Sequence, residues 1–372
     1  MSTTARKLSL PQAFDLARRL QSDGQLEDAR KLYERLLHFQ PGHPGALTML
    51  ASIGYQRGQD IQADAYIDRA NALYAEILQQ RPDDTQIRAA LVNQLLARGH
   101  RDQAQRYAQD LPLQMNPVRS DPSTFAQTRA RAIAEGRPRM LINTVPKSAS
   151  ETIWNRLAAG LGMAQSHVSI GLFPECTVLP YRMKTFMDGG IVAKEHLPAT
   201  RHNLRQLVDA GMTRVVFHVR DPRQATLSWA HFVQDDVSMR LLAPIWRQVV
   251  PHADVLAGGL EETVDWAIDK YLPQLVKFMT DWDALGRDPD QDIDVKFLSF
   301  EFFRNDEDAY VREVLGFYGI PYDTLAPDAQ SADVHYRKGE LDEWRDAFTR
   351  RQARRAWDAI PRDLAKRFGW RA

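Results

Sequence analysis

Two patterns of apolar positions divide the chain. In the first third, apolar residues such as Ala29, Leu32, Tyr33 and Leu36 recur at helical spacing, which predicts amphipathic helices. In the remainder, short apolar runs alternate with helical patterns. The runs expected to form strands are 140–145, 191–194, 215–219 and 295–299. This alternation predicts an α/β domain whose parallel sheet carries helices on both faces, preceded by an all-α domain.

Glycines punctuate the helical third at regular intervals. Gly24, Gly58 and Gly99 each follow a helical pattern, and the first two lie 34 residues apart, which is the tetratricopeptide period. Over roughly residues 8–110 the region resembles tetratricopeptide repeats, and the alternative is a generic helical bundle. Either arrangement lacks obvious chemistry, so we expect it to bind a protein partner, a substrate or a second copy of the chain.

Prolines separate the two parts of the chain. Pro112, Pro117 and Pro122 precede a polar, Arg-rich stretch that ends at Gly136 and Pro138. We therefore expect a helical-repeat domain over residues 1–111, a linker over 112–138 and an α/β domain over 139–372.

Composition excludes several classes of protein. Lys and Arg together number 48, as do Asp and Glu, and this balance disfavours non-specific binding to nucleic acid. A single cysteine, Cys176, excludes an intramolecular disulfide and multi-cysteine zinc sites, and it fits a cytoplasmic protein. No apolar run approaches the ~20 residues of a membrane span, so none is expected.

A candidate phosphate-binding loop follows the first expected strand. It reads Val-Pro-Lys-Ser-Ala-Ser-Glu-Thr over residues 145–152 and leads into a helical pattern. Backbone N–H groups at a helix start attract anions, and Lys147 and the neighbouring hydroxyls add a charge and hydrogen bonds. The glycines of a Walker A loop are missing. The alternative is an ordinary helix start capped by Ser148 or Ser150, with Lys147 in solvent.

Three more segments carry chemistry that suits an anion. Arg220 directly follows the strand 215–219, and Ser228 lies eight residues further on. Arg220 could bind a phosphate with its planar guanidinium, or it could lie on the surface beside a capped helix. The strand 191–194 ends at Lys194, and His196 beyond it is a candidate general base or a structural histidine. Near the C-terminus, Arg337, Lys338 and Gly339 could wrap an anion or form a solvated basic loop.

The order and content of these four segments resemble the sulfotransferases that use 3′-phosphoadenosine 5′-phosphosulfate (PAPS), especially the cytosolic type. The resemblance covers about residues 139–372 and implies a parallel-sheet, P-loop-like sulfotransferase domain. It implies that PAPS is the co-substrate and that no metal is needed. The donor-binding residues that it implies are Lys147, Ser148, Ala149, Ser150, Glu151, Thr152, Arg220, Ser228, Arg337, Lys338 and Gly339.

Two positions depart from the family's pattern. Ala149 stands where the family usually has glycine, and Glu151 stands where it usually has a hydroxyl residue. A carboxylate beside a phosphosulfate repels it unless it points away or pairs with a cation. Thr152 is the alternative source of the missing hydroxyl.

The resemblance also implies the catalytic groups for sulfuryl transfer to an acceptor hydroxyl by in-line displacement. His196 is expected to act as general base, Lys147 to stabilise the leaving 5′-phosphate, Ser148 to steer that lysine or bond the same phosphate, and Lys194 to add charge at the sulfuryl oxygens. The acceptor stays open among a glycan, a lipid, a peptide and a small molecule. Two other functions compete: a degenerate nucleotide-binding scaffold that acts through the helical region, and a P-loop kinase-like enzyme.

Overall fold

The structure is a computed structural model. It describes residues 8–22, 25–57, 59–97, 103, 106–107, 122–171, 173–235, 249–251, 253–326 and 340–372. The chain divides into two compact units, 1–113 and 114–372. The domain boundaries inferred from the sequence stay predictions.

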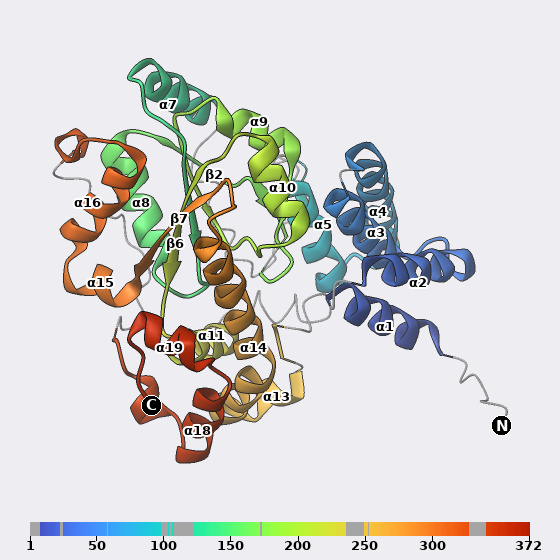
Figure 1. Ribbon diagram of the computed structural model, residues 1–372. Coiled ribbons are helices and arrows are strands. Elements are labelled where there is room, and N and C mark those ends of the chain that lie inside the picture. Colours follow the sequence, from blue (N-terminus) through green and yellow to red (C-terminus); the bar gives the residue numbers. More distant parts are fainter. Residues whose placement is uncertain are drawn as a thin grey trace. The chain divides into compact units, whose positions relative to one another are not determined.

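Unit 1 is helical throughout its described residues, as the amphipathic patterns predict (Figure 1). Consecutive helices pack on one another around a small core that includes Ala29, Tyr33 and Leu36. Helices α3 and α4 approach closely at Gly54, where an added Cβ would lie 3.1 Å from Cβ of Ala63. The helices are α1 (Leu10–Ser22), α2 (Leu26–Phe39), α3 (Pro44–Gln56), α4 (Asp60–Gln80) and α5 (Thr85–Ala97). The punctuating glycines Gly24, Gly58 and Gly99 lie outside the described residues.

Unit 2 is built on a five-stranded sheet with the order β2-β5-β1-β6-β7, and every pairing in it is parallel. The strands are β1 (Met140–Thr144), β2 (Ala164–Ser166), β5 (Ile191–Glu195), β6 (Arg214–Val219) and β7 (Asp294–Ser299). All four strands expected from apolar runs are present, which confirms the predicted fold class. Strands β1, β5 and β6 are buried along nearly their whole length and so read as continuous apolar runs, whereas the edge strand β7 is mostly half-buried.

Helices cover both faces of this sheet (Figure 1). Alternate residues of β1 show the division, because Met140 and Ile142 join one core whereas Leu141 joins the other. The first core involves α8 (Ser150–Leu161), α15 (Phe300–Asn305) and α16 (Glu307–Tyr318). The second involves α9 (Pro180–Met187), α10 (Arg201–Asp209), α11 (Pro222–Asp235), α13 (Ala253–Ala257), α14 (Gly259–Arg287), α17 (Trp344–Ala347), α18 (Arg350–Asp358) and α19 (Arg362–Phe368).

Some elements have no counterpart among the sequence expectations. Helix α7 (Pro122–Ala134) lies within the stretch 112–138 that was expected to be a linker, and its Ala132 is buried in the same core as β1. A small antiparallel pair, β3 (Ser169–Ile170) and β4 (Thr177–Val178), follows the edge strand β2, and a 3-10 turn, η1 (Tyr322–Thr324), follows α16. Within the described ranges, no helix combines the length and the apolar character that crossing a bilayer requires.

Candidate functional site

Three adjacent strands deliver their following residues to one edge of the sheet. The register pairs Asn143 of β1 with Glu195 of β5, and Thr144 with His218 of β6. The segments that follow these strands therefore emerge side by side, at the edge where parallel α/β sheets bind ligands. They are 145–149, 196–200 and 220–221.

The loop between β1 and α8 is held in a tight, left-handed turn. Lys147 and Ala149 have φ angles of 63° and 62°, values at which a side chain costs about 1–2 kcal/mol relative to glycine. The Ser148 hydroxyl donates to the carbonyl oxygen of Val145 at 2.5 Å, so in this structure it closes the loop on itself. The turn places the first N–H groups of α8 at the site's edge, where helix dipole and orphan donors favour an anion.

His218 supports this loop from inside the sheet. Its Nε2 lies 2.7 Å from the carbonyl oxygen of Ser148, and its Nδ1 lies 2.9 Å from the hydroxyl of Tyr310. A carbonyl only accepts, so Nε2 carries the proton and Nδ1 accepts from Tyr310. Burial lowers the pKa of His218 to about 3, so the ring is neutral at pH 7. None of the sequence motifs indicated His218, although a histidine inside the apolar run 215–219 is unusual enough to suggest a role.

His196, the expected base, is fixed by β1. Its Nδ1 lies 2.6 Å from the carbonyl oxygen of Thr144 and 3.1 Å from the hydroxyl oxygen of the same residue. Nδ1 therefore donates to that carbonyl, which leaves the lone pair on Nε2. Burial and, second, the nearby Lys194 ammonium lower the pKa of His196 to about 3. The imidazole is neutral at pH 7, with the tautomer that can take a proton at Nε2.

The backbone of Leu197, the residue after His196, is held by three hydrogen bonds. The Leu197 N–H donates to the side-chain oxygen of Asn143 at 2.7 Å, and the Leu197 carbonyl accepts from the Asn143 amide at 3.0 Å. The indole of Trp282 in α14 donates to the same carbonyl at 2.7 Å. Asn143 and Trp282 are both fully buried, so the core itself orients the segment that carries His196.

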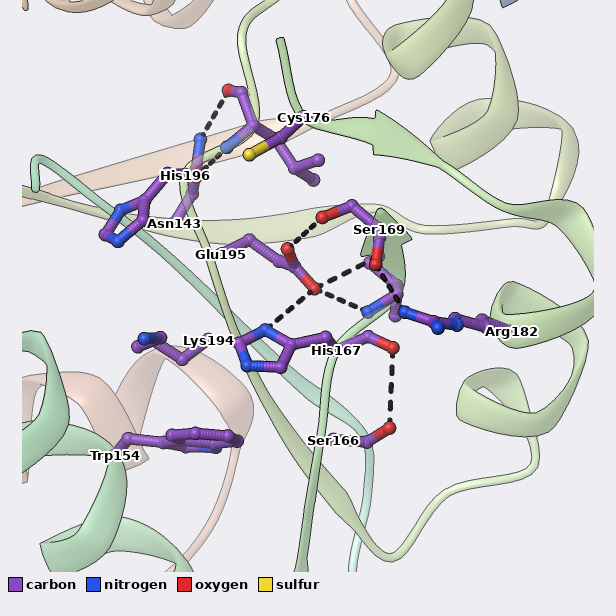
Figure 2. Close-up of polar contacts among 12 residues, drawn as sticks. Asn143, Trp154, Ser166, His167, Ser169, Cys176, Arg182, Lys194, Glu195 and His196 are labelled. Carbon is purple, nitrogen blue, oxygen red and sulfur yellow. Dashed lines mark hydrogen bonds and ion pairs between the residues drawn. The ribbon is translucent and has the colours of Figure 1, made fainter. Parts of the chain in front are cut away.

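Lys194 is paired at the start of α8. Its ammonium makes an ion pair with the carboxylate of Glu151, the second residue of that helix, and lies 5.3 Å from the ring centre of Trp154, one turn further along. Residues three apart share one helix face, so this face of α8 covers Lys194. Figure 2 shows Lys194 near the Trp154 ring. Of the two outcomes considered for Glu151, the structure shows the pairing with a cation.

Glu195, the residue after Lys194 in β5, has different partners from Lys194 (Figure 2). Its buried carboxylate accepts hydrogen bonds from the backbone N–H groups of Val168 and Ser169 and from the Ser169 hydroxyl. His167 Nδ1 lies 3.6 Å from it. Burial alone would raise the pKa of Glu195, but His167 and these donors outweigh that effect and hold the pKa below its ordinary value. Glu195 thus fastens the segment between β2 and β3 to β5.

Arg220 links two segments that are far apart in the sequence. Its guanidinium donates to the carbonyl oxygen of Lys147 at 2.5 Å and to that of Glu340 at 3.3 Å, and it lies 4.0 Å from the ring centre of Phe300. The Lys147 ammonium lies 3.9 Å from the ring centre of Phe232 in α11. Arg220 therefore joins the β1–α8 loop to the residue that directly follows the Arg-Lys-Gly segment.

A buried ion pair beside Arg220 was not singled out from the sequence. Asp221 accepts from Nε and Nη2 of Arg223 at 3.0 and 2.7 Å, and the Arg223 guanidinium lies 3.9 Å from the ring centre of Trp344. The side-chain oxygen of Gln224 accepts from the backbone N–H of Trp344 at 3.1 Å. These contacts bind α17 to the start of α11. The Arg-Asp-Pro-Arg motif could have indicated this contact, because two arginines around one aspartate predict an ion pair.

The structure brings together most of the expected site residues. Lys147, Ser148, Ala149, Ser150, Glu151, Thr152, Lys194, His196 and Arg220 lie on the adjoining segments described above. Ser228 is partly buried in the second turn of α11, and no described contact joins it to this group. Arg337, Lys338 and Gly339 lie outside the described residues.

One polar group in the first turn of α8 is buried without a described hydrogen-bond partner. The hydroxyl of Thr152, a residue 3% exposed, has no hydrogen-bond partner in the described part of the chain. Among the described residues, no group of three or more His, Cys, Asp or Glu side chains is placed to bind a metal ion. The arrangement combines a helix start, cations and a neutral imidazole, which suits binding of a phosphate-bearing ligand and proton removal beside it.

The fold and the site define an α/β protein with candidate anion-binding loops at the carboxyl edge of a parallel sheet, together with an all-helical N-terminal region. No protein-family model matches the chain, and no curated protein matches it. Among solved structures, it is similar to mouse sulfotransferase SULT7A1 complexed with PAP, with a TM-score of 0.42 and 13% identity over 64% of this chain and 88% of that one. It is also similar to a sulfotransferase from Alicyclobacillus acidocaldarius, with a TM-score of 0.30 and 17% identity over 68% of this chain and 94% of that one.

Proposed function

We propose that the chain is a sulfotransferase that moves the sulfuryl group of PAPS to an acceptor hydroxyl. In this reaction the acceptor oxygen forms a bond to sulfur while the bond from sulfur to the bridging oxygen of the 5′-phosphate breaks. The acceptor's proton passes to Nε2 of His196, and the leaving 3′,5′-bisphosphate (PAP) takes the electron pair. An in-line displacement of this kind requires positioning and charge stabilisation rather than a covalent intermediate.

The single observation that carries the proposal is the meeting of three strand-end segments. His196 is hydrogen-bonded to the carbonyl oxygen of Thr144 at the end of β1. Arg220 is hydrogen-bonded to the carbonyl oxygen of Lys147, just beyond that strand. An imidazole, an ammonium and a guanidinium that lie far apart in the sequence are thereby gathered around the start of α8. His196 is neutral at pH 7, and its Nε2 carries the lone pair that could accept a proton.

We assign the donor-binding roles as follows. Lys147 and Ser148 serve the 5′-phosphate, with the N–H groups of Ala149 and Ser150 and the hydroxyl of Thr152, which is buried and has no described partner. Arg220 serves the 3′-phosphate, since a guanidinium binds phosphate in bidentate fashion. Ser228, Arg337, Lys338 and Gly339 are assigned to the 3′-phosphate on the sequence motif alone. Lys194 serves the sulfuryl oxygens.

The test combines binding with transfer. PAP at 100 times its dissociation constant should stabilise the protein by about 2.7 kcal/mol, and ADP should have a much smaller effect. Labelled PAPS should then transfer sulfate to an acceptor in fractions of a cell extract. Equal stabilisation by ADP and PAP would instead favour a kinase-like nucleotide site.

The ion pair between Glu151 and Lys194 favours a second candidate, a nucleotide-binding scaffold without transferase activity. The Glu151 carboxylate pairs with Lys194, the lysine assigned to the sulfuryl group, and so weakens the positive potential at that lysine. The helices of unit 1 would then carry the function as tetratricopeptide-like repeats that bind a partner protein, in the cytoplasm. PAP binding without sulfate transfer to any fraction would support this candidate.

A further inference from the structure

The ion pair between Glu151 and Lys194 lies at the start of the helix that we assign to the donor's phosphosulfate. The side chains of Lys194 and Glu151 are 9% and 30% exposed, so the lysine is nearly enclosed; part of the Glu151 side chain reaches solvent, but its Oε2 atom is buried. Trp154 closes a further side of the ammonium. An enclosed ammonium is costly unless an anion satisfies it, and in this structure the anion is Glu151.

The same place attracts anions for a second reason. Glu151 is in the first turn of α8, where orphan N–H groups and the helix dipole favour negative charge. A carboxylate in this first turn interacts favourably with the helix N-terminus, as a bound phosphate or sulfate would. The ammonium also acts on the base, because its charge helps to lower the pKa of His196. Lys194 thus interacts with the first turn of α8 and also influences the imidazole of His196.

We propose that Glu151 is a built-in competitor for Lys194, which the sulfuryl group of PAPS must displace before transfer. This inference rests on the proposed function, and it specifies how the site regulates its donor. With PAPS bound, Lys194 turns from Glu151 to the sulfuryl oxygens. After transfer the sulfuryl group has left, Lys194 pairs with Glu151 again, and PAP loses a contact that PAPS had. Glu151 therefore weakens donor binding and narrows the difference between the affinities for donor and product.

The test measures the dissociation constants of PAPS and PAP by calorimetry on the full chain. Glu151→Gln removes the charge and keeps the shape, and we expect it to tighten PAPS binding about tenfold, because the sulfuryl group no longer has to displace a carboxylate from Lys194. PAP should tighten by a smaller factor. The variant without ligand should melt at a lower temperature than the wild type, because its enclosed ammonium has lost an anion. Glu151→Thr is a second variant if Glu151→Gln does not fold.

A double-mutant cycle with Lys194→Met tests whether Glu151 acts through Lys194. In that background Glu151→Gln should no longer tighten PAPS binding. The matched control is Glu313→Gln, which breaks another ion pair between a strand lysine, Lys296 of β7, and a helix glutamate, Glu313 of α16. The control should leave both dissociation constants unchanged.

Each outcome decides one question. If the wild type binds PAPS and Glu151→Gln binds it equally or more weakly, the competitor role is wrong while the proposed function stands. If tightening persists in the Lys194→Met background, Glu151 repels the donor directly and the exchange at Lys194 is wrong. If neither wild type nor variants bind PAP or PAPS, the proposed function itself fails.

Discussion

Nδ1 of His196 lies 2.6 Å from the carbonyl oxygen of Thr144, so a backbone group of the neighbouring strand sets the tautomer of the expected base. A backbone acceptor does not titrate. It therefore holds the lone pair on Nε2 over the whole pH range in which the ring is neutral.

The first prediction concerns His196 and pH. Replacing His196 with Ala should reduce kcat for sulfate transfer by ~100- to 10,000-fold, the usual contribution of a general base, and leave PAP affinity unchanged. Because the pKa of His196 is about 3, the base form is complete at every pH well above that value. The pH profile of kcat/KM should consequently show no acidic limb from this residue between pH 5 and 8. An acidic limb near pH 6.5 that disappears in the variant would contradict the burial argument.

Arg220 should determine recognition of the 3′-phosphate. Charge-assisted hydrogen bonds contribute about 1.5–3 kcal/mol each, so Arg220→Met should weaken PAP binding by at least tenfold. Binding of AMP, which lacks the 3′-phosphate, should change much less. Calorimetry on both nucleotides is the measurement. Arg345→Met, which alters an exposed arginine of α17, is the control, and an equal loss for AMP and PAP would assign Arg220 to loop structure alone.

Ala149 should be a stabilising site. Its φ of 62° is unfavourable for alanine by about 1–2 kcal/mol relative to glycine, so Ala149→Gly should raise the free energy of unfolding by up to about 1 kcal/mol after the entropy cost of glycine. Urea unfolding gives the number. Ala158→Gly in the interior of α8 is the control and should lower stability by about 1 kcal/mol. Destabilisation by both changes would show that the Ala149 methyl makes a packing contact that outweighs the strain.

Glu195 should make the stability of the fold depend on pH in the acidic range. Its pKa is lowered in the folded protein, so its carboxylate stabilises the fold above the unfolded pKa of about 4.3, and that contribution disappears as pH falls through the folded value. Glu195→Gln should be less stable than wild type at pH 7, and the difference should shrink as pH falls below about 4.3. Thermal unfolding of both proteins across this range is the check. A difference that stays constant with pH would mean that the interactions of Glu195 do not depend on its charge.

The central strands of the sheet can be predicted from the sequence more easily than the edge strand β2 and the helix α7. Strands buried on both faces appear as apolar runs, whereas β2 (Ala-Gln-Ser) has no apolar pattern and joins the sheet only because β5 offers an edge. Helix α7 is similar, since its mean character is polar and its Ala132 finds a core only in the folded unit. Tertiary pairing rather than local propensity decides such elements.

For the site, residue types could be inferred but not their partners. That Lys147, His196 and Arg220 follow strands is visible in the sequence, and parallel topology then brings them to one edge. The pairing of Glu151 with Lys194 depends on how α8 lies across β5, which spacing along the chain does not give. The role of Glu195, a residue next to the expected base, likewise depends on which way β5 turns its side chain. The assigned roles of all these residues stay predictions.

The three bonds that hold the Leu197 peptide have a consequence for acceptor choice. A backbone unit tied to Asn143 on one side and to Trp282 on the other cannot tilt without breaking several of these bonds at once. The segment that carries His196, the proposed base, is thus firmly positioned by the core. Under the proposed function, acceptors of different size must be accommodated by other parts of the site, and engineering for new acceptors should leave Asn143 and Trp282 untouched.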